Sequence, residues 1–157
     1  MAFISGGYSV TYNAATVGQI ANGIRISHEF FKRMITGDNY AETPQDGVFR
    51  GGQMFAEMTL LEYNATGAQL AFWPYSATIF TLGTVGRLDV ASSLAKSLVL
   101  TAVAGTPAAA APATQTHLTT ILREGFPVEL LYAPDLREVP LNMSIYPSSS
   151  GVFGTQT

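Results

Sequence analysis

Two segments of this chain alternate apolar and polar side chains with a period of two, and this feature constrains the fold most. The alternating face of residues 24–31 carries Ile24, Ile26, His28 and Phe30. The corresponding face of residues 53–63 carries Met54, Ala56, Met58 and Leu60. A period of two over eight or more residues indicates a β-strand. Together the segments predict a long antiparallel hairpin. With the first strand continued to Met34, the strands cover residues 24–34 and 53–63, and at about 3.3 Å per residue each extends about 35 Å. That is longer than a domain of this size needs to cover its own core. The excess length predicts pairing with something outside the chain.

The rest of the chain also has the pattern of an all-β protein, because Gly and Pro fall at short intervals between alternating segments. Further strands are predicted at residues 8–12, 97–103, 116–123, 128–132 and 141–146. Residues 64–75 are the best helix candidate, since Asn64 or Thr66 can cap a helix that Pro74 ends. Residues 78–82 and 86–90 are short strands or irregular. We expect a single, mainly β domain over residues 1–157.

Three segments without alternation are candidate assembly elements. Residues 36–52 are polar and rich in turn formers, which predicts a long loop, and loops of more than about 12 residues tend to be functional. The alternative is a surface excursion without a role. Residues 104–114 are rich in Ala and Pro and predict a mobile hairpin loop. Residues 147–157 resemble an extended arm more than a folded element.

The surface of this chain has few charges, since 12% of its 157 residues are charged, against about 25% in ordinary globular domains. Either uncharged polar residues cover the surface, or much of it is buried in an assembly, and we favour the second. The net charge is −3 and the eight cations are scattered, which disfavours sequence-specific nucleic-acid binding. The N-terminal residues do not resemble a secretory signal, and no run of about 20 apolar residues predicts a membrane anchor, so we expect a soluble protein.

The sequence contains few residues that could support catalysis. Cys is absent, so a thiol nucleophile, a disulfide and a Cys-ligated metal are excluded. His28 and His117 both fall in predicted strands, and the apolar neighbours of His28 favour a core or interface histidine over a catalytic one. Nucleophile-elbow, P-loop, dinucleotide-binding and metal-ligand spacings are all missing. Glu57 and Glu62 are an odd number of residues apart, which places them on opposite faces of a strand. We therefore expect no enzymatic activity and no cofactor.

One stretch resembles a known family. Residues 38–46 (Asp-Asn-Tyr-Ala-Glu-Thr-Pro-Gln-Asp), then Gly51-Gly52 and residues 57–62, are similar to the loop-and-strand region of major tail tube proteins of long-tailed bacteriophages. The opening Gly-Tyr-x-Val-x-Tyr-Asn at residues 7–13, followed by Val17-Gly18 and the Ile pair at 24 and 26, fits the same family. The resemblance covers roughly residues 6–64, and the C-terminal half is similar only in style.

The resemblance implies a β-sandwich or partial barrel with one short flanking α-helix and a long hairpin that joins an inter-subunit β-barrel. It implies a structural virion protein, made in the bacterial host cytoplasm, that forms homohexameric rings. The rings stack into a tail tube that conducts DNA during ejection. Partners would be further copies, other tail proteins at the tube ends, and DNA in transit. The resemblance places the ring-assembly loop at Asp38, Tyr40, Thr43, Pro44 and Asp46.

A lumen that lets DNA slide should be polar and neutral or acidic, because each cation on a phosphate adds affinity. The polar face of the hairpin provides the lumen candidates Arg25, Ser27, Glu29, Gln53, Glu57 and Thr59, of which Arg25 is discordant. For Glu29 and Glu57 the alternative is an ordinary solvated sheet face. For the protein, the alternatives are a neck or tail-terminator ring, the tube of a contractile injection system, or a monomeric β-barrel that binds a small apolar ligand.

Overall fold

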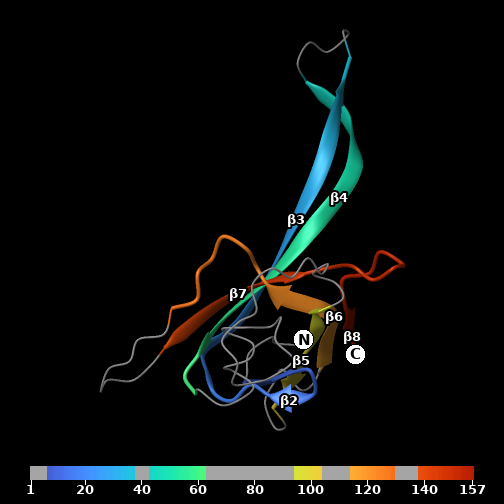
Figure 1. The fold of residues 1–157 in the computed structure, drawn as a ribbon. Helices are drawn as coiled ribbons and strands as arrows, with labels where there is room; N and C mark the ends of the chain where they lie inside the picture. Colours follow the sequence, from blue (N-terminus) through green and yellow to red (C-terminus); the bar gives the residue numbers. More distant parts are fainter. Residues whose placement is uncertain (1–6, 38–42, 63–93, 104–113, 130–137) are drawn as a thin grey trace.

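The computed structural model describes residues 7–37, 43–62, 94–103, 114–129 and 138–157 (Figure 1). The strands are β1 (Tyr8–Tyr12), β2 (Ala15–Thr16), β3 (Ile20–Thr36), β4 (Pro44–Leu60), β5 (Lys96–Ala102), β6 (Thr114–Leu122), β7 (Val139–Ile145) and β8 (Thr155–Gln156). Within the described ranges they form one antiparallel sheet in the order β2-β1-β5-β6-β7-β4-β3, with β8 also beside β6. Over these ranges the sheet is not closed. The mainly β prediction is confirmed.

The long hairpin is confirmed, and it is longer than predicted. Each of β3 and β4 has 17 residues, which at about 3.3 Å per residue gives strands of about 56 Å. Figure 1 shows the hairpin projecting away from the rest of the strands. Strand β7 pairs with β4 only from Met54 to Leu60, so the outer part of the hairpin is a two-stranded ribbon in the described structure. We call residues 30–36 and 44–52 the distal arm.

The predicted loop at 36–52 is wrong for most of its length, because residues 44–52 belong to β4. β-Bulges accommodate the residues that look like turn formers. Phe31 is opposite Gly51 and Lys32 is opposite Phe49, which leaves Arg50 as an extra residue, and Gly51 has a φ of 112° that favours glycine. Pro44 is the first residue of its strand, where a missing N–H is tolerated.

The inner face of the sheet carries the core, as the alternation predicts. Met58, buried on β4, lies opposite Ile24 on β3 and Leu141 on β7. The buried core side chains are those of Val10, Tyr12, Val17, Ala56, Met58, Leu60, Leu98, Leu100, Val139, Leu141, Met143 and Ile145. Ile24, Ile26 and Met54 are partly buried and pack against this cluster. Phe30 lies on the same alternating face as Ile24 and Ile26, which predicts a place in the core, but it is 60% exposed because the body of the domain ends before it.

The shorter strand predictions agree with β1, β5, β6 and β7 to within two residues at each end. The predicted strand at 128–132 is not formed at Val128 and Glu129, and its remaining residues lie outside the described ranges. The helix predicted at 64–75 and the segments 78–82 and 86–90 also lie outside them, as do residues 104–113 of the Ala/Pro-rich loop.

The C-terminal segment folds back onto the body, so the prediction of an extended tail is wrong for residues 153–157. Strand β8 pairs with β6, and Thr114 and Thr157 exchange two backbone hydrogen bonds of 2.8 and 2.9 Å. The backbone oxygen of Phe153 lies 3.0 Å from Nδ1 of the buried His117. Before β8, residues 148–152 form a tight turn, in which the N–H of Ser148 donates to the backbone oxygen of Val152 at 2.9 Å.

Candidate lumen and assembly surfaces

The structure places all six lumen candidates on one face of the hairpin, opposite the core. In the register of β3 and β4, Arg25 is opposite Glu57 and Glu29 is opposite Gln53. Ser27 lies between these two pairs on β3, and Thr59 follows Glu57 on the same face of β4. We call this surface the polar face. Its assignment follows from strand alternation, because the intervening β4 residues Ala56, Met58 and Leu60 are buried in the core.

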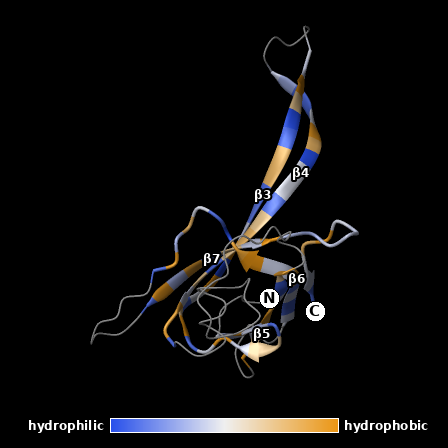
Figure 2. Cartoon of the chain, in the orientation of Figure 1, coloured by the Kyte–Doolittle hydropathy of each residue, from blue (hydrophilic) through white to orange (hydrophobic). Residues whose placement is uncertain are grey.

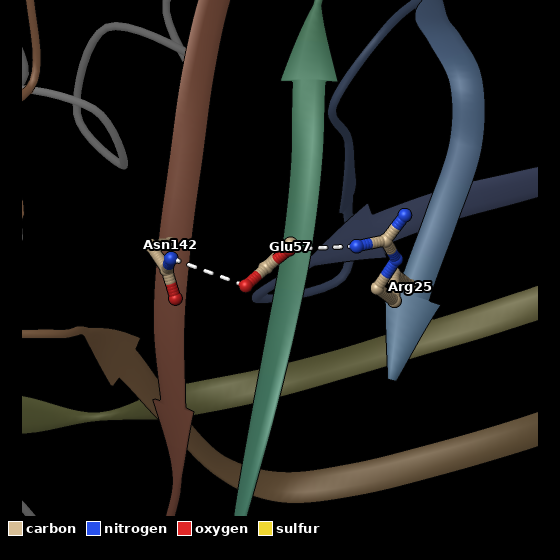
Figure 3. Close-up of polar contacts among 3 residues, drawn as sticks. All are labelled: Arg25, Glu57 and Asn142. Carbon is tan, nitrogen blue, oxygen red and sulfur yellow. Dashed lines mark hydrogen bonds and ion pairs between the residues drawn. The ribbon is translucent and has the colours of Figure 1, made fainter. Parts of the chain in front are cut away.

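A row of polar contacts crosses three strands of the polar face (Figure 3). The Arg25 guanidinium on β3 lies 3.8 Å from the Glu57 carboxylate on β4, with 77% and 41% of the two side chains exposed. The Asn142 amide on β7 donates a hydrogen bond of 3.4 Å to the other Glu57 oxygen. An exposed ion pair contributes at most about 1 kcal/mol to stability. Its more important effect is that Glu57 partly offsets the charge of Arg25, the one discordant residue among the candidates.

A second contact lies further along the hairpin. The side-chain amide of Gln53 donates to the Glu29 carboxylate at 2.6 Å, which links the two strands on this face. Charge-assisted hydrogen bonds of this kind are shorter and stronger than neutral ones. With Arg25 counted against Glu29 and Glu57, the six candidates have a net charge of −1.

An aromatic and guanidinium cluster interrupts the polar face. Phe55 projects between Gln53 and Glu57, and the guanidinium carbon of Arg123 lies 3.8 Å from the centre of its ring. Phe126 approaches the same guanidinium at 4.6 Å. Between Arg123 and Phe126 in the sequence, Gly125 has a φ of 78°, which allows the chain to turn back after β6.

Sequence reasoning missed Arg123 and Asn142 as residues of the polar face. Residue 142 alternates with the apolar Leu141 and Met143, which indicates an outward position on its strand. Their place beside Glu57 and Phe55 depends on the pairing of β7 with β4 and of β6 with β7, which local patterns do not contain.

The distal arm exposes apolar side chains and unpaired strand edges together. Six large apolar residues are exposed on it: Phe30, Phe31, Met34, Ile35, Val48 and Phe49. Figure 2 shows hydrophobic stretches along both strands of the arm. Within the described residues, the outer edge of β3 has no neighbouring strand, and neither does the edge of β4 before Met54. Exposed edges and apolar patches of this kind mark pairing or interaction surfaces.

The predicted assembly-loop residues lie partly on this arm. Thr43 precedes β4, while Pro44 and Asp46 belong to it, and all three are exposed. The Asp46 carboxylate accepts a hydrogen bond of 2.7 Å from the N–H of Gly47. Asp38 and Tyr40 lie outside the described residues.

Both histidines contact Phe153 of the C-terminal segment. His28 is exposed at the base of the arm, with its ring centre 4.2 Å from that of Phe30 and 5.7 Å from that of Phe153. His117 is buried, and its other ring nitrogen lies 2.9 Å from the amide nitrogen of Gln115. His28 is therefore not a core residue, and His117 links β6 to the C-terminal segment.

Among the described residues, the structure contains no group of three His, Cys, Asp or Glu side chains that could hold a metal ion. The same part of the chain contains no helix with the length and apolarity to cross a membrane. In comparisons with known protein families and with curated proteins, the chain has no match.

Proposed function

We propose that this protein is a structural virion subunit that assembles with copies of itself into homohexameric rings, which stack into a phage tail tube that conducts DNA. In this proposal it has no catalytic activity and no cofactor. It is made in the bacterial host cytoplasm, and its other partners are tail proteins at the tube ends. The observation that carries the proposal is the distal arm, a long ribbon with exposed apolar side chains and, among the described residues, no strand along either edge.

The arm is poorly stabilised by the described remainder of its chain. An isolated two-stranded hairpin is marginally stable in water at best. Burying a Phe side chain contributes about 1.5–3 kcal/mol, and Phe30 and Phe49, each 60% exposed, realise less than half of that in the single chain. Association with a further copy would bury these side chains, which supports self-assembly as the role of the arm.

The free edges also favour a ring over a simple dimer. The edge of β3 and the edge of β4 at residues 44–53 are different surfaces, so each copy can present one edge to the copy before it and the other to the copy after it. Such head-to-tail contacts generate closed rings when the rotation closes. The polar face, with its mixed and locally paired charges, suits a lumen that DNA passes without being held.

The finer architecture belongs to the same proposal: a β-sandwich or partial barrel with one short flanking helix at residues 64–75. Contacts between distant parts of the sheet support the sandwich or partial barrel. Val10 on β1 and Met58 on β4 belong to one core cluster, although β5, β6 and β7 separate their strands in the sheet. The Tyr12 hydroxyl donates to the backbone oxygen of Thr120 at 2.9 Å, across the intervening strand β5. The sheet therefore curves around its core.

Mass measurement and negative-stain microscopy of the purified protein test the proposal. We expect hexameric rings and tubes from the unmodified protein, and monomers from a Phe30→Ser, Phe49→Ser variant with an unchanged core. Leu118→Ser is the matched control, because Leu118 is 65% exposed on β6 and lies off the arm. Rings that never stack would favour a neck or terminator ring. A monomer at high concentration would refute self-assembly and favour the ligand-binding barrel.

A further inference from the structure

Arg123 differs from the other cation on the polar face in its surroundings. Arg25 lies 3.8 Å from the Glu57 carboxylate, which offsets its charge. Arg123 has two aromatic neighbours, Phe55 and Phe126, and among the described residues the structure gives it no carboxylate partner. Its positive charge is therefore the least compensated on this face.

Two aromatic rings also pack against the guanidinium. Its carbon lies 3.8 Å from the centre of the Phe55 ring and 4.6 Å from the centre of the Phe126 ring, and the face of each ring attracts the cation. The backbone of Arg123 is fixed as well, because its N–H donates to the backbone oxygen of Asn142 at 2.9 Å. A guanidinium is well suited to a phosphate group, because two of its N–H donors can bond to two phosphate oxygens in parallel.

The position of Arg123 extends the polar row. Asn142 bonds to Glu57 through its side chain and to Arg123 through its backbone, so the row runs from Arg25 through Glu57 and Asn142 to Arg123. Arg123 therefore lies beside the surface that would face DNA in the proposed tube.

We propose that Arg123, which packs against Phe55 and Phe126, is a contact site for the phosphodiester backbone of double-stranded DNA. This inference rests on the proposed function, because that function brings DNA to the polar face. We expect the contact to be weak. Glu29 and Glu57 lie on the same face, so their two negative charges balance the positive charges of Arg25 and Arg123. A ring of such contacts would centre the DNA without retaining it.

The test measures binding of a fluorescent 30-base-pair DNA duplex by anisotropy, over a series of salt concentrations, after microscopy has established the assembly state. Arg123→Leu keeps an apolar cover over Phe55 and removes the charge. It is expected to assemble normally, bind the duplex more weakly, and reduce the slope of log K against log salt by about one for each subunit in contact. Arg123→Lys, which keeps the charge, is expected to restore most of the slope. Lys96→Gln removes a charge from β5 and is expected to have no effect.

Several results would overturn the contact: no binding by the unmodified protein at low salt, an Arg123→Leu variant that binds as the unmodified protein does, or equal losses in Arg123→Leu and Lys96→Gln. An Arg123→Lys variant as weak as Arg123→Leu would also overturn it. The outcome is distinguishable from failure of the proposed function. Monomers whose DNA binding depends on Arg123 would refute the tube and support the contact. Tubes in which Arg123→Leu leaves DNA binding unchanged would support the tube and refute the contact.

Discussion

Substitutions at two adjacent residues of β4 test the assignment of the two hairpin faces. Met58 is 4% exposed and lies in the core cluster, opposite Ile24 on one side and Leu141 on the other. Truncating a buried Met costs about 2–5 kcal/mol, and placing an unpaired carboxylate there adds several kcal/mol more. Since a domain has a total stability of about 5–15 kcal/mol, Met58→Asp is expected to unfold the subunit.

Glu57→Gln is the matched substitution on the other face. The Glu57 side chain is 41% exposed, its ion pair with Arg25 is worth at most about 1 kcal/mol, and Gln keeps an oxygen that accepts the Asn142 hydrogen bond. For a domain of this size, a loss of 1 kcal/mol lowers Tm by about 2–4 °C. Circular dichroism melts of both variants provide the measurement. If Met58→Asp melted within a few degrees of Glu57→Gln, the assignment of faces would be refuted.

Three smaller predictions follow from backbone and terminal contacts. Gly52→Ala should loosen the arm more than Gly51→Ala, as measured by hydrogen exchange. A Cβ at residue 52 would lie 2.7 Å from a backbone oxygen of β3. A Cβ at residue 51 would meet nothing within 4 Å and would incur only the strain of a positive φ. Deleting residues 153–157 should leave the subunit folded but should weaken ring stacking. The free energy of unfolding, measured in urea, should fall by about 1–3 kcal/mol from the loss of the Phe153 partner of buried His117 alone. Tyr12→Phe should cost about 0.5–1.5 kcal/mol in the same assay, through the loss of a buried hydrogen bond to β6.

The sequence was sufficient to predict the faces of the hairpin because alternation is a local property that the core enforces. A shift of one residue would have exposed Met58 and buried Glu57, and this cost fixes the register. The same reasoning failed for residues 44–52. Pro44, Asp46 and Gly47 are turn formers by local preference, yet pairing with β3 makes them strand, since tertiary context overrides weak propensities.

Contacts between elements distant in sequence were not predictable. The hydrogen bond from Asn142 to Glu57 joins residues 85 positions apart, and the stacking of Arg123 on Phe55 depends on the order of β6, β7 and β4 in the sheet. Strand β8 has two residues, too few to show any period, and its place beside β6 follows from non-local pairing.

The composition of the arm limits how far a lumen can extend along the hairpin. From Arg25 to Glu29 the outward face of β3 is polar, but the next residues on that face include the exposed Phe31 and Ile35. The opposite face of the arm is also apolar, with Phe30 and Phe49 exposed. A partner that covered one face would leave the other in water. In the proposed assembly the polar base of the hairpin therefore lines the lumen, while the distal arm inserts between neighbouring copies that cover both of its faces.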